Sequence, residues 1–344
     1  MAKLSKKKNE QPARKKESSM AAWALYSLLA ILIIAYALLG NELVGLAALL
    51  TIIAIFYYEV KYSLKTEGAR KSAMDIGVAI GAALLVWLVL ILALHTTAPI
   101  DAVSSCSMLP VLQRGDIVAL GGIGNVTQFA ESKRVPVVGV GSGAFQRMES
   151  NMSSEFLSFY AYAKGNMSQI AYIFDNSTPH GIGLYNTACL SRYSYLGESK
   201  YFSRCYVNMS QGNNLIKYGY SIGNVSVAGV VHSIVYTSSI TVGNATIAAN
   251  YGNPIVVYQT TDKDYFTGSI IHRVFAVLNV SGSYYFLTKG DNNQALDIEF
   301  ENYPANASAV TGVVLADVPL VGYVKLLLSG QLAVPAGCNQ TILK

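Results

Sequence analysis

The sequence has little charge and few of the residues that build metal sites or disulfide frameworks. Only 13% of its 344 residues are charged, and it contains four cysteines and four histidines. No two cysteines form a Cys-x-x-Cys pair and the histidines stand singly, so the sequence predicts no metal site and no cofactor. Four cysteines are too few for a disulfide framework, and the candidate pair for a single bridge is Cys189 with Cys205.

Excess positive charge is absent from most of the chain. Residues 1–72 hold eleven Lys and Arg and five acids, a charge of +6, whereas the other 272 residues hold fourteen basic and fifteen acidic side chains, a charge of −1. A nucleic-acid-binding protein needs clustered cations on its folded domain. The distribution therefore excludes a nucleic-acid partner and predicts that the basic N-terminal region sets a membrane topology.

Three apolar runs follow the basic tail, at Ala21–Leu39, Leu43–Tyr58 and Ile76–Leu94. About 20 helical residues span a hydrocarbon core of ~30 Å, so the first and third runs qualify and the second is marginal. Cations precede the first run and occupy the loop 59–73, which places both in the cytosol and the chain after about residue 96 outside. An alternative for the first run is a cleaved signal peptide, because Ala35-Tyr36-Ala37 has a small-x-small pattern.

Acceptor sequences for N-glycosylation occur only in the part predicted to lie outside. Ten asparagines open Asn-x-Ser/Thr without an intervening proline, and all lie after residue 100. They are Asn125, Asn151, Asn166, Asn176, Asn208, Asn224, Asn244, Asn279, Asn306 and Asn339. This one-sided distribution agrees with the topology and predicts a glycosylated outer surface.

A twelve-residue segment soon after the third apolar run combines hydroxyls with turn-forming residues. It reads Ser105-Cys106-Ser107-Met108-Leu109-Pro110-Val111-Leu112-Gln113-Arg114-Gly115-Asp116, and Ser107 lies 13 residues beyond Leu94. The segment resembles the serine-nucleophile box of type I signal peptidases, which reads S-x-S-M-x-P followed by a short apolar stretch and G-D.

Two later segments resemble the remaining boxes of the same family. They are Ile270-Ile271-His272-Arg273-Val274 and Leu287-Thr288-Lys289-Gly290-Asp291-Asn292-Asn293, the latter followed by Asp297. Bacterial members carry Lys before Arg-Val, whereas archaeal members and those of the endoplasmic reticulum carry His, so this chain resembles the second branch. Asp291 and Asp297 stand six residues apart, as the two acidic positions of that branch do. The resemblance covers roughly residues 97–120 and 253–325.

The resemblance implies a division of roles among these residues. Ser107 would be the nucleophile, His272 the general base, Asp297 the acid that orients the histidine, and Asp291 a supporting acid. Lys289 is the alternative base, for a Ser-Lys dyad, although it stands outside the position before Arg-Val.

Further residues of the boxes receive implied roles in the same way. The Ser107 backbone amide and the Ser105 hydroxyl are the candidate oxyanion donors. Met108 and Ile270 are candidate walls of a shallow substrate pocket that admits side chains the size of alanine. The family position that matches Cys106 varies, so its backbone and small size are expected to matter more than its thiol.

Strand signals dominate beyond residue 100. Runs rich in β-branched and aromatic residues occupy Asp116–Leu120, Pro254–Thr260, Ser269–Val280 and Ser283–Thr288, and two more flank Pro319 within Val310–Val324. Ser281-Gly282 predicts a two-residue hairpin turn, which pairs residues whose numbers sum to 563 and sets His272 opposite Asp291. The hairpin thus favours Asp291 as the neighbour of the histidine, whereas the resemblance favours Asp297.

Together these patterns predict a membrane protein with three N-terminal transmembrane α-helices and an exported, mainly-β, signal-peptidase-like catalytic domain with a large β-rich insertion. The predicted parts are a basic cytosolic tail (1–18), the three helices (19–96), the catalytic domain (97–125 and 253–325), the inserted lobe (126–252) and a C-terminal tail (326–344). The insertion is the main departure from the family pattern. In the tail, Leu326-Leu327-Leu328 predicts a membrane-surface contact or a packed helix.

The resemblance implies a membrane-bound serine endopeptidase of the archaeal kind that removes signal peptides from exported preproteins after small residues. Its partners would be preprotein signal peptides, the lipid bilayer and the protein-export machinery. Its location would be the cytoplasmic membrane, multi-pass, with the catalytic domain on the extracytoplasmic side. Two alternatives stay open: a related peptidase for a narrow set of surface proteins, and a non-catalytic surface glycoprotein on the same scaffold.

Overall fold

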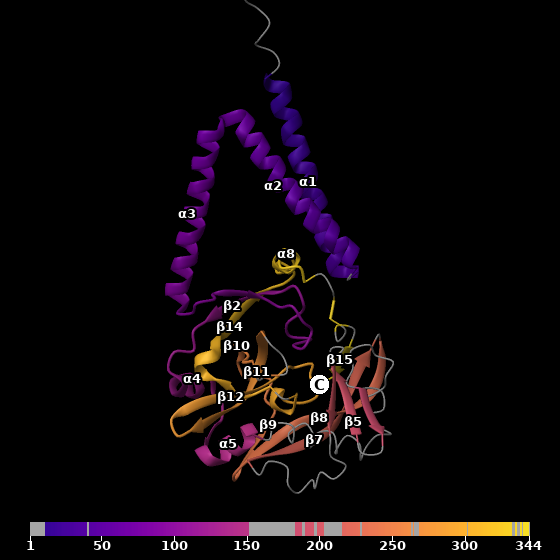
Figure 1. Ribbon diagram of the computed structural model, residues 1–344, viewed down its shortest axis with the longest axis vertical. Helices are drawn as coiled ribbons and strands as arrows, with labels where there is room; N and C mark the ends of the chain where they lie inside the picture. The colour runs from indigo at the N-terminus through magenta and orange to yellow at the C-terminus, as the bar shows by residue number, and fades with distance from the viewer. Residues whose placement is uncertain are drawn as a thin grey trace, which may run out of the picture. The chain divides into compact units, whose positions relative to one another are not determined.

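The computed structural model describes residues 11–39, 41–150, 183–187, 190–195, 198–202, 215–227, 229–262, 264, 268–300, 302–331, 334–335, 338 and 340–343. The chain divides into two compact units, one of residues 1–89 with 320–334 and one of residues 90–319 with 335–344. The first, here called the helical unit, contains the N-terminal helices. The second, here called the β unit, contains the sheets (Figure 1).

The three predicted N-terminal helices form, as α1 (Gln11–Leu39), α2 (Glu42–Glu67) and α3 (Ala69–Leu94). Among the described residues, two helical stretches are long and apolar enough to cross a membrane, Leu43–Lys65 and Ala69–Leu94, and α1 contains the apolar stretch Ala22–Tyr36. The second run, predicted to be marginal, is therefore long enough to span, because α2 continues past Tyr58 for two further turns. The first apolar run lies inside α1, and its role as a membrane span stays a prediction.

Tyrosine rings hold the helical unit together. Tyr36 of α1 is buried against α2 at Gly45, where a Cβ atom would lie 3.0 Å from the ring. The same ring meets Tyr323 of α8 (Tyr323–Leu328) edge-on, with centroids 5.2 Å apart. The leucine patch of the C-terminal tail thus belongs to a packed helix, in which Leu326 and Leu327 are buried.

An eight-stranded sheet forms the centre of the β unit. Its order is β1-β2-β14-β10-β11-β12-β13, and β3 pairs with β11 in parallel. The bounds are β1 Ile100–Ala102, β2 Ile117–Gly121, β3 Val137–Val140, β10 Ile255–Gln259, β11 Ser269–Val280, β12 Ser283–Lys289, β13 Ala305–Asn306 and β14 Val310–Val318. The strands predicted up to residue 318 are confirmed. The strand predicted after Pro319 is wrong, because the apolar residues at 323, 326 and 327 have the spacing of one helix face and form α8.

Strand β11 is buried on both faces, which explains its continuous apolar run from Val274 to Leu278. On one face, Val274 and Val277 pack against Phe129 of α4 (Val126–Lys133). On the other, Phe275 and Leu278 share a cluster with Met148 of α5 (Ser142–Ser150). The strand that carries His272 is therefore set in the core of the unit.

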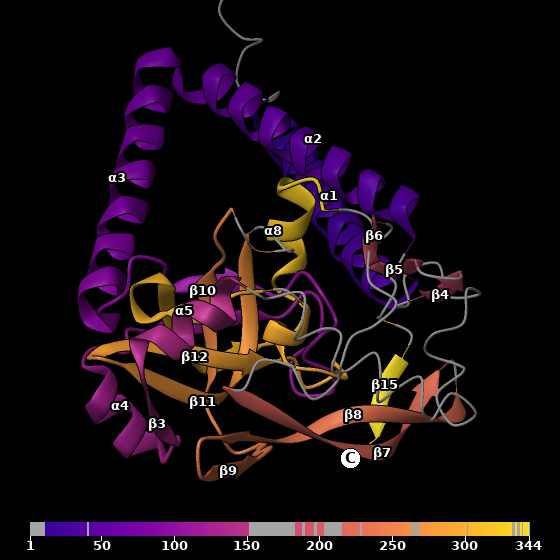
Figure 2. The same ribbon diagram turned by 60° about the horizontal axis from the view of Figure 1, so that its bottom comes forward.

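The region predicted to be an inserted lobe contributes to this core as well as to sheets of its own. Helices α4 and α5 pack on β11, and β3 joins the main sheet. The later part forms a three-stranded sheet of β4 (Gly183–Thr187), β5 (Leu190–Tyr195) and β6 (Glu198–Phe202). It also forms β7 (Ile216–Val227), β8 (Val230–Val242) and β9 (Ala245–Ala248), which β15 (Gln340–Leu343) from the C-terminal tail extends in the order β15-β7-β8-β9 (Figure 2). The insertion is thus β-rich but not separate from the main sheet.

One disulfide ties the tail to the serine box. Cys106 is bonded to Cys338, 232 residues away in sequence. The expectation that the Cys106 thiol has little importance is therefore wrong, since that thiol forms a long-range covalent link. The proposed partners Cys189 and Cys205 lie outside the described residues.

Half of the predicted glycosylation sites lie among the described residues. Asn224 and Asn244 are exposed on β7 and the β8–β9 turn. The side-chain oxygens of Asn125, Asn279 and Asn306 accept hydrogen bonds from nearby backbone amides. The other sites, Asn151, Asn166, Asn176, Asn208 and Asn339, lie outside the described residues. Glycosylation stays a prediction.

Gly122 marks a close backbone approach at the start of the β unit, and we expect alanine there to destabilise the fold. Its amide donates to Leu94 O at 2.7 Å, and a Cβ atom would lie 2.1 Å from the carbonyl oxygen of His95. Gly122→Ala should lower the free energy of unfolding by about 1–3 kcal/mol, because backbone must move to relieve the overlap. Gly139→Ala on β3 is the matched control, since nothing lies within 4 Å of its added atom. Thermal unfolding in detergent measures both, and equal melting temperatures would contradict the prediction.

Candidate active site

The serine box folds into a tight turn whose apolar side chains anchor it. Leu109 N donates to Cys106 O at 3.3 Å and Val111 N donates to Met108 O at 3.0 Å. The Met108 side chain is buried in a cluster with Leu112 and Val118 of β2. This anchoring leaves Ser107 half-buried at the surface of the turn.

The Gly-Asp pair at the end of the box shapes the backbone. Gly115 has φ +91°, a conformation that favours glycine. The Asp116 carboxylate accepts from Gln113 N at 2.7 Å and is buried. Arg114 donates through Nε to Ser104 O at 3.2 Å. These three residues therefore brace the turn that carries Ser107.

Ser107, His272 and Asp297 lie in a continuous hydrogen-bonded chain. The Ser107 Oγ atom is 2.9 Å from His272 Nε2, and His272 Nδ1 is 2.7 Å from Asp297 Oδ2. His272 comes from β11, and Asp297 opens a short 3-10 helix, Asp297–Phe300. The Ser105 hydroxyl lies 3.2 Å from the Ser107 hydroxyl. An arrangement of hydroxyl, imidazole and carboxylate in this order can activate a serine as a nucleophile.

The hairpin prediction for Asp291 is wrong because β11 contains a bulge. From Val280–Ser283 to Ala276–Leu287 the paired residues sum to 563, as predicted. The register then shifts at Phe275, so that Arg273 lies opposite Lys289 rather than Gly290. Strand β12 ends at Lys289, and the chain beyond it folds back to bring Asp297, not Asp291, to the histidine.

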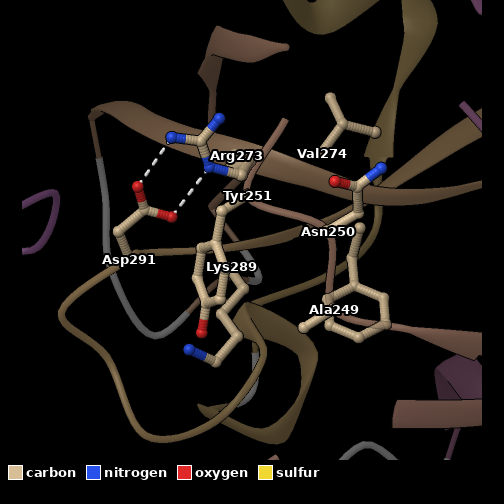
Figure 3. Close-up of a pocket in the computed structure, with 8 residues that line it drawn as sticks. Ala249, Asn250, Tyr251, Arg273, Val274, Lys289 and Asp291 are labelled. Carbon is tan, nitrogen blue, oxygen red and sulfur yellow. Dashed lines mark hydrogen bonds and ion pairs between the residues drawn. The ribbon is translucent and has the colours of Figure 1, made fainter. Parts of the chain in front are cut away.

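Asp291 pairs instead with the arginine that follows the histidine. Arg273 Nε lies 2.8 Å from Asp291 Oδ1, and Nη2 lies 2.7 Å from Oδ2 (Figure 3). Both side chains are buried. Lys289 directs its ammonium group to the carbonyl oxygens of Gly290 and Asn293. Of the two candidate bases, His272 has its Nε2 atom 2.9 Å from Ser107 Oγ.

Two hydroxyl groups that sequence reasoning missed support Asp297. Its Oδ2 atom accepts from Tyr258 OH at 3.0 Å and from Thr288 Oγ1 at 2.6 Å. Burial, assisted by the charge of Asp297, raises the pKa of Tyr258 well above its usual range. Tyr258 therefore stays a protonated donor. Thr288 belongs to the segment Leu287–Asn293 that resembles the family's acidic box, which was its only signal in the sequence. Tyr258 had the pattern of an ordinary strand residue.

The loop after β12 also contacts the serine box directly. Asn292 N donates to Ser107 O at 2.7 Å, and Asn292 Nδ2 donates to Cys106 O at 3.0 Å. A Cβ atom on Gly290 would lie 2.7 Å from Ser107 O. Glycine at 290 permits this approach without movement of the Ser107 backbone.

The two candidate walls of the substrate pocket lie in different parts of the core. Met108 belongs to the cluster with Val103 and Val118, and Ile270 packs against the cluster that contains Phe129 and Val256. The structure does not bring them together into one cluster. Their role in substrate binding, like that of the Ser105 and Ser107 oxyanion donors, stays a prediction.

Part of the chain is similar to known catalytic subunits of signal peptidase complexes. The signal peptidase complex catalytic subunit SEC11 of Verticillium alfalfae is 40% identical over 79 residues, which is 22% of this chain and 44% of the relative. The SEC11 subunits of Chaetomium globosum and Yarrowia lipolytica are 39% and 37% identical, with the same shares of each chain. The chain thus spans less than half the length of the relatives it matches. No protein-family model and no solved structure matches it. The resemblance to the endoplasmic-reticulum branch of type I signal peptidases is confirmed over the matched segment.

The raised pKa of Tyr258 leads to a prediction for stability at alkaline pH. In the unfolded chain the phenol ionises near pH 10, whereas in the folded protein it keeps its proton to higher pH. The stabilisation is therefore complete below about pH 10 and is lost as the pH rises further; at pH 11 the loss is about 1.4 kcal/mol. Tyr258→Phe should remove this part of the alkaline loss, measured as the difference in unfolding free energy between pH 9 and pH 11. An identical difference in both proteins would contradict it.

Proposed function

We propose that this chain is a membrane-anchored signal peptidase, a serine endopeptidase that removes signal peptides from exported preproteins after small residues. The observation that carries the proposal is the hydrogen-bonded chain in which Ser107 Oγ lies 2.9 Å from His272 Nε2 and His272 Nδ1 lies 2.7 Å from Asp297. The similarity to SEC11, named as the catalytic subunit of the signal peptidase complex, supports the substrate class.

In the proposed mechanism His272 removes the Ser107 proton as the hydroxyl attacks the scissile carbonyl. Asp297 holds the ring nitrogen Nδ1 and stabilises the imidazolium that forms. The Ser107 amide and the Ser105 hydroxyl would donate to the oxyanion. His272 then returns the proton to the leaving amine, and water repeats the sequence on the acyl-enzyme to release the serine.

The anchoring helices explain how such a site would meet its substrate. Stretches Leu43–Lys65 and Ala69–Leu94 are long and apolar enough to cross a bilayer. The charge distribution supports an extracytoplasmic location for the β unit, where a translocated preprotein would emerge with its apolar segment still in the lipid. We therefore propose a multi-pass enzyme of the cytoplasmic membrane with α1 as a further span. Its proposed partners are preproteins, the bilayer and the export machinery, and the exposed sequons are its proposed glycosylation sites.

Cleavage of a defined preprotein tests the assignment. The full chain in detergent is mixed with a reporter protein that carries an apolar leader ending in Ala-x-Ala, and release of the reporter is followed by gel shift. Wild type should cleave, whereas Ser107→Ala should cleave no faster than the uncatalysed background, because the attacking atom is gone. His272→Ala should fail likewise, while Lys289→Ala should retain catalysis per folded molecule. Turnover by Ser107→Ala at the wild-type rate would exclude the proposed serine mechanism.

The two acids should differ in what their loss costs. Asp297→Ala should lower kcat by about 10⁴-fold, because the histidine loses its orienting partner. Asp291→Ala leaves the buried Arg273 without its bidentate partner and should destabilise the fold by about 3–5 kcal/mol. Molecules that remain folded should keep much of their activity. Thermal unfolding and initial rates on the same samples measure both effects. A larger loss of kcat in fully folded Asp291→Ala than in Asp297→Ala would reverse the assigned roles.

A further inference from the structure

We propose that the sheet β15-β7-β8-β9 is a positioning frame for the catalytic acid. The loop from Gly290 to Phe300 carries Asp297, and this sheet holds the loop on both sides of that residue. The inference rests on the proposed function and assigns a role to the inserted segment that the family resemblance left unexplained. Its working residues are Tyr220 and Thr237 on one side of Asp297 and the backbone of β15 on the other.

On the C-terminal side of Asp297, the sheet binds a buried carboxylate through hydrogen bonds. Glu299, two residues after Asp297, has no exposed surface. Its Oε1 atom accepts from Tyr220 OH at 2.9 Å, and its Oε2 atom accepts from Thr237 Oγ1 at 2.8 Å. Leu296 N also donates to Oε2, at 2.9 Å. A buried carboxylate is tolerated only where donors compensate its lost hydration, so the sheet and the loop are energetically dependent on each other.

The pairing of β7 with β8 brings both donors to the same place. Tyr220 and Thr237 lie directly opposite each other across the two strands. The register shifts beside this pair, because Gly219 faces Ser239 and leaves Ser238 as an extra residue. Thr237 N also donates to Gln294 O in the loop, at 2.7 Å. The bulge therefore lies where β8 offers a backbone donor and a side-chain donor to the same loop.

On the N-terminal side of Asp297, strand β15 binds the Asn292 side chain through hydrogen bonds. Ile342 N on β15 donates to Asn292 Oδ1 at 2.8 Å, and Asn292 Nδ2 donates to Gln340 O at 2.8 Å. The same Nδ2 reaches Cys106 O beside the nucleophile. Cys106 is in turn disulfide-bonded to Cys338, just before β15. Strand β15 and the adjacent disulfide therefore hold both the start of the loop 290–300, here called the acid loop, and the residue before Ser107.

These contacts connect the frame to catalysis through geometry. Asp297 lies between Asn292 and Glu299 in the sequence. Its Oδ2 atom must stay within hydrogen-bonding distance of His272 Nδ1. A misplacement of about 1 Å in a catalytic group can cost about 100-fold in rate. Tyr220 and Thr237 are thus positioning residues that act through Glu299 and do not touch the reacting atoms.

Thr237→Val tests the frame because it removes one hydroxyl with little change of shape. The assay uses the full-length enzyme and the Ala-x-Ala reporter preprotein, with kcat, KM and the pH profile measured. We expect kcat to fall by about 10- to 100-fold with KM nearly unchanged. We also expect the acid limb, which is the fall of the rate at low pH, to move to lower pH. A displaced Asp297 carboxylate stabilises the imidazolium less. Thr237→Ser, which keeps the hydroxyl, should restore both.

A matched control lies on the same strand. The Thr241 hydroxyl contacts Thr246 on β9 and not the acid loop, so Thr241→Val should leave kcat and the acid limb unchanged. Tyr220→Phe provides a second test if Thr237→Val does not fold, and it should move kcat and the acid limb in the same directions. The pH midpoint does not depend on the amount of folded enzyme, so it separates a positioning effect from partial unfolding.

The outcomes separate this inference from the proposed function. Wild-type kcat and acid limb in folded Thr237→Val or Tyr220→Phe would overturn the frame while leaving the peptidase assignment intact. A lower rate with an unmoved midpoint, or failure of Thr237→Ser to restore it, would also overturn it. Absence of cleavage by the wild type itself would instead reject the proposed function.

Discussion

The hydrogen bond between His272 and Asp297 is the interaction on which the rest of the site depends. It joins a strand in the centre of the main sheet to a loop that lies beyond the end of β12. Tyr258 and Thr288 donate to the same carboxylate oxygen, so the acid is held by groups from three strands. Three donors therefore fix the position of the Asp297 carboxylate against the imidazole ring.

Two other buried acids of the same loop have partners of their own. Asp291 faces Arg273 in a bidentate pair, and Glu299 accepts from Tyr220 and Thr237. Both acids therefore bind groups other than the histidine. The loop that carries three carboxylates therefore presents only Asp297 to the imidazole. The contacts of Glu299 also explain why a segment absent from the family pattern is integrated with the site.

The β11–β12 hairpin shows where sequence reasoning succeeds and where it stops. The Ser281-Gly282 turn and the register near it follow from local chemistry, because φ is +52° at Ser281 and +93° at Gly282. The bulge at Phe275 lies inside a continuous run of buried apolar residues, and no local pattern predicts it. The one-residue shift removes Asp291 from the position opposite His272, and the loop after β12 then pairs Asp291 with Arg273.

The sequence by itself determined the features that depend on short windows: the apolar helices, the strand runs, the turn, and the boxes that contain Ser107, His272 and Asp297. The tertiary structure decided which acid meets the histidine, that Cys106 bonds to Cys338, and that the tail completes a sheet of the insertion. The physical reason is sequence separation. Ser107 lies 165 residues from His272, and Cys106 lies 232 residues from Cys338. Contacts of this range are selected by packing and buried hydrogen bonds of the whole fold, which no local pattern encodes.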